Sequence, residues 1–287
     1  MKNTILKAYA KLNLSLNILP ERGERGFFKV KFLNTHISLF DSVRISKINH
    51  RSLQINEPTI DQEKNIAFRA AELMFETFNI PGGVSINILK NIPLRAGLGG
   101  GSSDAAAVIN GLVKLYGLSL EKDQRLSLVK KIGMDVCYCI TGGLCRIEGI
   151  GDVVQRLPFK LPVLNLLVAT PREKKSSTAW AYSIIDKENI GINRKKLEDL
   201  IVGIKSQNII KIASSIHNDF ESPISRYYPI VQQIKTSMMK HGAMNAVLAG
   251  SGLSVFGIFE NDINILKAKS SLEKDEISCF ITHTIDD

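Results

Sequence analysis

The segment best suited to chemistry is a glycine-rich run, AGLGGGSSDAA, at residues 96–106. Four glycines in five positions let the backbone adopt conformations closed to other residues and bring its N–H groups close to a ligand. A strand pattern precedes the run and an Ala-rich helical pattern follows it, so a helix beginning at 102–104 would add free N–H groups and the positive end of its dipole. The sequence therefore predicts a cradle for a di- or triphosphate, with the hydroxyls of Ser102 and Ser103 available to phosphate or Mg²⁺.

The run differs from the two commonest phosphate-binding motifs. No Gly-Lys-Ser/Thr follows the glycines, and Ser102 stands where G-x-G-x-x-G would have its third glycine. The alternative is a glycine-rich turn in which Ser or Asp caps the next helix. Four glycines and two serines at a strand-to-helix junction favour the phosphate cradle.

Two charged residues stand out from apolar surroundings. Lys11 interrupts an alternating apolar strand at 8–18, and Asn13 lies on the same face. Asp135 lies between a helix that ends at Gly133 and an apolar run that begins at Val136. A surface lysine on an edge strand and a turn-forming aspartate are the alternatives to a functional role.

The elements that would position these residues alternate between strands and helices. Before residue 170 we expect strands at 8–18, 27–32, 36–46, 84–89, 137–148 and 163–169, and helices at 65–78, after the glycine run, and at 120–132 with Ser119 as N-cap. Beyond it we expect helices at 177–185, 195–200, 209–217 and 228–241, and two short strands within 246–259. This pattern predicts an α+β protein with a boundary near 160–170.

Composition limits the possible partners. The chain has 287 residues, 44% of them hydrophobic, and a net charge of +9, which favours anionic ligands. The basic residues are scattered and only 7% of residues are aromatic, so a stacking platform for nucleic acid is not expected. No apolar run is long enough for a signal sequence or a membrane span, and four cysteines without a C-x-x-C pair predict buried thiols. We therefore expect a cytoplasmic protein with neither nucleic acid nor membrane as partner.

The glycine-rich run also carries a family resemblance. PLRAGLGGGSSDAA resembles the ATP-binding motif of the GHMP kinases, which phosphorylate galactose, homoserine, mevalonate and phosphomevalonate. The triple glycine, the double serine and the preceding KNIP are most similar to the 4-diphosphocytidyl-2-C-methyl-D-erythritol kinases. AYAKLNLSLNI and LAGSGLSVFGIF resemble the first and third family motifs, and EKNIAFRAA, GMDVCYCITGG and HNDFE also match, so the similarity spans nearly the whole chain.

The resemblance implies a fold and a reaction. The fold would be the two-domain GHMP kinase architecture, with a ribosomal-protein-like N-terminal domain at 1–160 and a ferredoxin-like C-terminal domain at 161–287. The reaction would be ATP- and Mg²⁺-dependent phosphorylation of a hydroxyl of 4-diphosphocytidyl-2-C-methyl-D-erythritol, in non-mevalonate isoprenoid precursor biosynthesis. The partner would be this small molecule, and the protein a monomer or weak homodimer. Alternatives are a kinase of homoserine or a mevalonate derivative and a basic RNA-binding protein.

The resemblance also assigns residues. Lys11 matches the family's catalytic lysine, which stabilises the substrate alkoxide, and Asp135 matches the base that takes the hydroxyl proton. The implied ATP-binding residues form one continuous segment, Pro93, Leu94, Arg95, Ala96, Gly97, Leu98, Gly99, Gly100, Gly101, Ser102 and Ser103, with Ser103 as the Mg²⁺ ligand. The implied substrate-binding residues are Asn13, Phe27, Phe28, Thr178, Tyr182, Gly250, Ser251 and Gly252.

The chain departs from the family pattern where the base would bind. The usual Asp-Gly-Tyr-His is replaced by Arg25, Gly26, Phe27 and Phe28, so a stacking ring remains but the histidine's hydrogen-bonding edge is lost. We expect the base to stack between Phe27 and Tyr182, with weaker discrimination against uridine than a side-chain reader would give. Two further departures are Cys137 in place of a proline and Arg95 in place of a small or apolar residue.

Overall fold

A computed structural model describes residues 2–23, 26–185 and 190–286, so Arg25 lies outside the described residues. The chain divides into two compact units. The first comprises Met1–Ala10, Leu39–Ile92 and Gly99–Thr141, and the second comprises Lys11–Ser38, Pro93–Leu98 and Gly142–Asp287. Two long strands, β1 (Asn3–Arg22) and β2 (Phe28–Ile48), therefore contribute to both units. The predicted sequence domains, 1–160 and 161–287, are a different division and stay a prediction.

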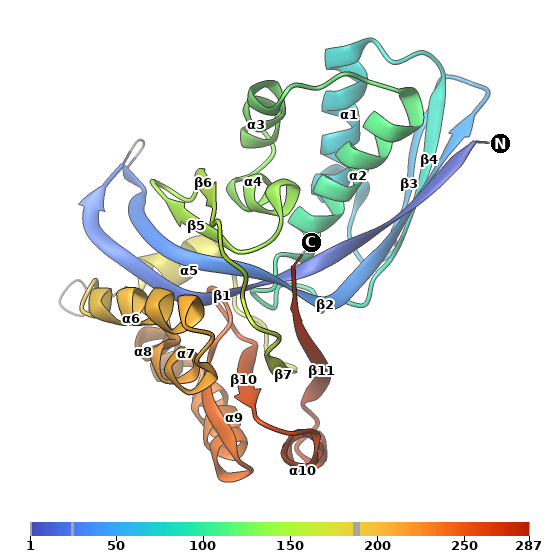
Figure 1. Ribbon diagram of the computed structural model, residues 1–287. Coiled ribbons are helices and arrows are strands. Elements are labelled where there is room, and N and C mark those ends of the chain that lie inside the picture. The colour runs from blue at the N-terminus through green and yellow to red at the C-terminus, as the bar shows by residue number, and fades with distance from the viewer. Residues whose placement is uncertain (1, 24–25, 186–189, 287) are drawn as a thin grey trace. The chain divides into compact units, whose positions relative to one another are not determined.

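The first unit contains a small sheet and four helices. The later part of β2 pairs antiparallel with β4 (Gly83–Leu89), and β4 pairs parallel with β3 (Leu53–Asn56). The helices of this unit are α1 (Ile66–Phe78), α2 (Gly100–Tyr116), α3 (Lys122–Lys130) and α4 (Met134–Thr141), with a short 3₁₀ helix at Gln62–Lys64. Helices α1 and α2 lie side by side (Figure 1).

Close packing of α2 depends on a glycine. A Cβ atom at Gly111 would lie 2.4 Å from Cδ1 of Ile45 and 2.9 Å from Cδ1 of Leu6. Both distances are too short for a real contact, so only glycine lets the helix approach the sheet at this point. The helix that begins at the glycine-rich run is thereby fixed against β1 and β2 within the first unit.

The helix ends agree with the sequence only in part. Asn65 caps α1, as its side chain accepts the N–H of Ala67 at 2.9 Å, so the predicted helix at 65–78 is confirmed. Helix α2 begins at Gly100, slightly before the predicted start at 102–104. The N-cap of α3 is Glu121 and not Ser119, which corrects that prediction.

The predicted strand at 137–148 is wrong over its first half. Residues Met134–Thr141 form helix α4, and only β5 (Cys145–Glu148) is a strand. Val136, Cys137 and Tyr138 are buried on the helix, and a short apolar run of this kind does not distinguish a helix from a strand. Gly142 and Gly143, both with φ of 67°, separate the two elements.

The second unit is built on an antiparallel sheet in which β7 (Asn165–Thr170) lies between β10 (Val255–Phe259) and β11 (Ser278–Ile285), as Figure 1 shows. Strand β9 (Ala243–Leu248) extends the sheet beyond β10, and β11 pairs with β2 at His36 and Ile37. The remaining strands are β5, which pairs with β2 and β6 (Val153–Arg156), and β8 (His217–Asn218), which pairs with β1.

The helices of the second unit follow the sheet strands. They are α5 (Thr178–Ser183), α6 (Arg194–Lys205), α7 (Ile209–Ser215), α8 (Glu221–Tyr227), α9 (Ile230–Lys240) and α10 (Asp262–Lys274). Helices α9 and α10 pack against the sheet of β7, β9, β10 and β11. Helices α8 and α10 and strand β11 were not predicted from the sequence.

Two further sequence predictions concern the cysteine thiols and membrane spans. No disulfide joins the four cysteines, all of which lie in the described part of the chain. Cys137 and Cys145 are buried as predicted, whereas Cys139 and Cys279 are only half-buried. Within residues 2–23, 26–185 and 190–286, no helix combines the length and apolar composition that a membrane span requires.

Candidate active site

Lys11 is held inside the second unit by a chain of amides. It is only 5% exposed, and its Nζ donates a hydrogen bond of 2.8 Å to Oδ1 of Asn13. Asn13 in turn donates from Nδ2 to Oδ1 of Asn34 on β2, at 2.6 Å. Alternation along β1 places Lys11 and Asn13 on one face of the strand. The alternative of a surface lysine on an edge strand is therefore wrong.

The start of the glycine-rich run contacts this lysine. The backbone N–H of Lys11 donates to the carbonyl of Leu98 at 2.9 Å. Gly97, with φ of 84°, lies so close to the turn at 249–252 that a Cβ atom would be 2.0 Å from the carbonyl oxygen of Ala249. On the other side, a Cβ atom at Gly250 would be 3.3 Å from both Nζ of Lys11 and Oδ1 of Asn13. Within the second unit, the structure thus brings together residues from all three regions that the sequence singled out.

Helix α2 begins without a capping side chain. Its N-cap is Gly99, with φ of 70°, and no side chain bonds to the first turn. The N–H of Ser103 bonds to the carbonyl of Gly99 at 2.9 Å, whereas the N–H groups of Gly100, Gly101 and Ser102 have no acceptor among the described residues. Unpaired donors at the positive end of a 17-residue helix fit a polyphosphate.

The two serines of the run differ in their contacts. Ser103 is buried, and its hydroxyl donates to the carbonyl of Tyr9 at 2.6 Å, whereas Ser102 is half-buried with no hydrogen-bond partner for its hydroxyl among the described residues. The structure describes no cluster of three or more His, Cys, Asp or Glu side chains that could hold a metal ion. The role of Ser103 as Mg²⁺ ligand stays a prediction.

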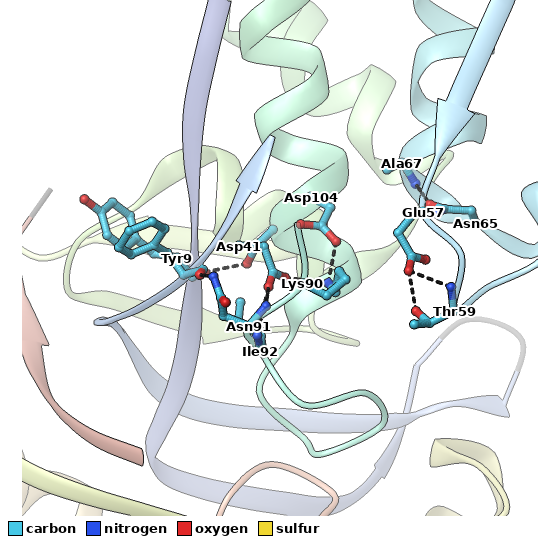
Figure 2. Close-up of polar contacts among 12 residues, drawn as sticks. Tyr9, Asp41, Glu57, Thr59, Asn65, Ala67, Lys90, Asn91, Ile92 and Asp104 are labelled. Carbon is cyan, nitrogen blue, oxygen red and sulfur yellow. Dashed lines mark hydrogen bonds and ion pairs between the residues drawn. The ribbon is translucent and has the colours of Figure 1, made fainter. Parts of the chain in front are cut away.

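A buried ion cluster that the sequence did not reveal lies where β4 leads into the glycine-rich run (Figure 2). Lys90 donates to Asp41 of β2 and, at 2.6 Å, to Oδ2 of Asp104 of α2. Oδ1 of Asp41 also accepts the backbone N–H groups of Asn91 at 2.6 Å and Ile92 at 2.8 Å. Asp41 and Lys90 therefore fix the backbone just before Pro93, where the predicted ATP-binding segment begins.

The charges in this cluster do not balance. Oδ1 of Asp104 is buried and has no hydrogen-bond partner among the described residues. Burial, together with the negative charge of Asp41 and against the opposing effect of Lys90, raises the pKa of Asp104 to about 7. Burial lowers the pKa of Lys90, but Asp104 and Asp41 outweigh it and hold that pKa above its ordinary value. Lys90 is therefore charged at neutral pH, and Asp104 is partly protonated.

Asp135 lies in the first turn of α4, in the first unit, and is exposed. A carboxylate at this position is favoured by the positive end of the helix dipole. The sequence placed it at the entrance of a strand, whereas the structure places it at the beginning of a helix. Its pairing with Lys11, a residue of the second unit, stays a prediction.

The predicted base-binding rings are arranged differently from the expectation. Phe28, and not Phe27, lies against Tyr182, with ring centroids 6.0 Å apart and planes inclined by 21°. The guanidinium of Arg22 covers Phe28, 3.3 Å from its ring centroid. Phe27 is 56% exposed. The alternation along β2 turns Phe28 inward against Tyr182. Stacking of the base between Phe27 and Tyr182 stays a prediction.

Thr178 begins α5 and lies beside the turn at 249–252. Its hydroxyl is 3.3 Å from the hydroxyl of Ser251, so either oxygen can donate. Both side chains belong to the second unit. Thr178 therefore joins Gly250 and Asn13 among the predicted substrate-binding residues that lie near Lys11 or its neighbouring turn.

Sequence comparisons show which family this chain represents. It is 40% identical over 274 residues to a 4-diphosphocytidyl-2-C-methyl-D-erythritol kinase of Caldicellulosiruptor saccharolyticus, with 94% of this chain and 92% of the relative covered. It is 38% identical over 287 residues to the kinase of the same name from Acetivibrio thermocellus, with 99% and 100% covered. The chain belongs to the 4-diphosphocytidyl-2-C-methyl-D-erythritol kinase family.

The structure of this family member agrees with the assignment. It matches a crystal structure of a 4-(cytidine 5'-diphospho)-2C-methyl-D-erythritol kinase with a TM-score of 0.84 and 27% identity, covering 98% of this chain and 99% of the other. The models of the GHMP kinase N-terminal and C-terminal domains match residues 65–143 and 200–276, on either side of residue 160. The fold is the predicted two-domain GHMP kinase fold with mixed helices and strands, and the protein is a small-molecule kinase.

Proposed function

We propose that the protein transfers the γ-phosphoryl group of ATP to a hydroxyl of 4-diphosphocytidyl-2-C-methyl-D-erythritol, a step of non-mevalonate isoprenoid precursor biosynthesis. The observation that carries this proposal is the 38–40% identity, over more than nine-tenths of the chain, to kinases named for that substrate. A GHMP kinase fold alone would fit several small alcohols, so the choice of alcohol rests on these relatives.

In the proposed reaction, Asp135 accepts the proton of the substrate hydroxyl as the oxygen forms its bond to the γ-phosphorus. The bond from that phosphorus to the bridging oxygen breaks, and ADP leaves with the electron pair. Lys11 stabilises the charge on the attacking oxygen and on the transferred group. Since phosphoryl transfer has a loose transition state, most of the contribution of these residues is positioning and charge stabilisation.

The polyphosphate would be held by residues 93–103. The unpaired N–H groups at the start of α2 support this role, as does the tight packing of Gly97 against the turn at 249–252. Mg²⁺ would neutralise part of the phosphate charge, with Ser103 as the predicted ligand and the partner-free hydroxyl of Ser102 as a second candidate.

The base would be recognised beside Tyr182. Phe28 has no polar group with which to read a base, and its ring already contacts the guanidinium of Arg22 and lies against Tyr182. Stacking contributes about 1–3 kcal/mol per base without reading its identity. We therefore expect the cytidine compound to be preferred over its uridine analogue by a smaller factor than hydrogen bonds from a side chain would give.

A panel of alcohols with labelled ATP tests the proposal. The panel contains the diphosphocytidyl alcohol, its uridine analogue, homoserine and mevalonate, each with the wild-type protein and with Asp135→Asn as a control. We expect rapid transfer to the diphosphocytidyl alcohol alone, slower transfer to the uridine analogue, and loss of both in the variant. Transfer to homoserine or mevalonate instead would contradict the substrate assignment. Salt-sensitive RNA binding without any transfer would contradict the enzyme itself.

Three expectations about the setting of this reaction go with the proposal. They are a cytoplasmic location, a monomer or weak homodimer in solution, and a small molecule as the main partner. Size-exclusion chromatography with light scattering measures the second directly. A tight higher oligomer would contradict it.

A further inference from the structure

A lysine that no sequence motif singled out is buried beside the turn at 249–252. Lys175 lies between β7 and α5, is 4% exposed, and donates from Nζ to the carbonyl oxygen of Gly252. Its neighbour Lys174 is exposed. A buried ammonium group is unfavourable unless it is hydrogen-bonded and its charge is compensated, so the position of Lys175 calls for a functional reason.

Lys175 and Asn218 together occupy carbonyl groups in and beside the turn. Asn218 on β8 donates from Nδ2 to the carbonyls of Leu248 and Gly250, both at 2.7 Å, and Lys175 takes that of Gly252. Among the described residues, the N–H groups of Gly250 and Ser251 have no acceptor. The N–H of Gly252 donates to the carbonyl of Ala249 at 2.9 Å, so the turn has three occupied carbonyls, of Ala249, Gly250 and Gly252, and two adjacent unoccupied N–H donors. Two adjacent free N–H groups are the pattern of an anion-binding concavity.

The charge around the turn is positive and uncompensated within the second unit. In its described part, no carboxylate lies at ion-pair distance from Lys175 or from Lys11, whose Nζ is 3.3 Å from a Cβ atom built on Gly250. Burial, the charge of Lys11 on β1 and the charge of Lys174 on its own segment lower the pKa of Lys175 to about 8. A bound anion would relieve this repulsion.

We propose that Lys175 is a positioning residue for phosphoryl transfer, which acts by holding the carbonyl of Gly252 so that the N–H groups of Gly250 and Ser251 stay free for a phosphate group near Lys11. The identity of that phosphate rests on the proposed function. It belongs either to ATP or to the diphosphate of the alcohol, and the two sources share the same chemistry.

The test compares K175M and K175R with K174M, a change of the same type at the exposed neighbouring position. K175M is expected to lower kcat/KM by about tenfold to hundredfold, the range for one lost hydrogen bond to a charged group. K174M is expected to stay within about twofold of the wild type, as surface changes usually do. A rise in KM for ATP would assign the phosphate to the nucleotide, and a rise in KM for the alcohol would assign it to the diphosphate.

A pH profile separates positioning from mere structural support. We expect kcat/KM of the wild type to fall above about pH 8, where Lys175 loses its proton, and K175R to move this fall to higher pH because arginine stays charged. An unchanged alkaline fall in K175R would overturn the proposal. The proposal would also be overturned if K175M melted at a lower temperature than the wild type but had the same kcat/KM as K174M. If K175M does not fold, the K175R profile decides.

Melting curves with inorganic pyrophosphate give a readout without turnover. The wild type and K174M are expected to be stabilised by this anion, and K175M by clearly less. Equal stabilisation of all three would overturn the proposal. If the wild type transfers phosphate to none of the alcohols, the proposed function fails, whereas the pyrophosphate comparison still tests Lys175.

Discussion

Asp104→Asn is expected to remove a pH dependence from the stability of the protein. The pKa of Asp104 is raised from 3.8 to about 7 in the folded chain, mainly by burial. Between these values the unfolded state has released a proton that the folded state still holds, so wild-type stability falls as pH rises from about 4 to about 7 and stays low above it. The difference corresponds to an upper limit of about 4 kcal/mol, at about 1.4 kcal/mol per pH unit.

An asparagine keeps the shape of the protonated side chain and cannot ionise. Its carbonyl oxygen can accept from Lys90, and Asp41 remains as the counter-charge of that lysine. Because the variant loses one ion pair, we expect a net gain of about 1–3 kcal/mol at pH 8. Near pH 4, where the wild-type carboxyl is also protonated, the two proteins should be almost equally stable. The raised pKa of Lys90 changes the pH dependence of stability only above pH 10.5, the ordinary pKa of lysine, and so does not affect stability between pH 4 and pH 8.

Urea unfolding of both proteins at pH 5, 6, 7 and 8 measures this difference. Asp61→Asn serves as the control, because Asp61 is an exposed carboxylate of the same unit and its pKa is lowered, first by its hydrogen bond from Lys64. We expect the Asp104 variant to diverge from the wild type as pH rises and the control to stay parallel to it. If the difference between the Asp104 variant and the wild type is the same at every pH, Asp104 takes up no proton and the reasoning about its burial is wrong.

Four further changes test the candidate site. Asp135→Asn is expected to lower kcat by on the order of a hundredfold or more while ATP still raises the melting temperature, and near-normal kcat would contradict its role as base. Gly97→Ala places a Cβ atom 2.0 Å from a backbone carbonyl, so the ATP-dependent rise in melting temperature should be lost, and its retention would show that this segment does not bind phosphate. Arg95→Gly relieves a non-glycine φ of 56° and should raise the unfolding free energy in urea by about 1 kcal/mol, whereas a decrease would show that the arginine is unstrained. Phe28→Ala should raise KM for the alcohol with little change in kcat, and a larger effect of Phe27→Ala would assign the base to the exposed ring.

Local chemistry made part of the site predictable. The glycine-rich run, the strand with Lys11 and Asn13, and the helix at 65–78 each depend on residues close together in the sequence, and each has the expected local structure. The alternation of side chains along a strand, which places Lys11 and Asn13 on one face of β1, would also have favoured Phe28 over Phe27 as the inward ring of β2.

Other parts depend on contacts that no local pattern records. Lys90 meets Asp104, which is 14 residues away, and Asp41, which is 49 residues away, so the ion cluster exists only once β2, β4 and α2 are assembled. The apolar run after Asp135 fits a helix and a strand equally well, and the packing of α4 against α2 decides between them. Nothing in the sequence distinguishes Lys175 from its neighbour Lys174, so its burial beside the turn at 249–252 could not be predicted.

The passage of the chain between its two compact units, at residues 10, 38, 92, 98 and 141, limits how the protein can be divided. A fragment ending near residue 160 would contain the whole first unit, but it would carry 11–38 and 93–98 away from the rest of the second unit, so the second unit would be divided between the two fragments. Exchange of halves between homologous kinases would likewise join strands whose inner faces evolved separately. Recombination and fragment complementation in this family are therefore expected to succeed at loops within a unit, and to fail at the midpoint of the sequence.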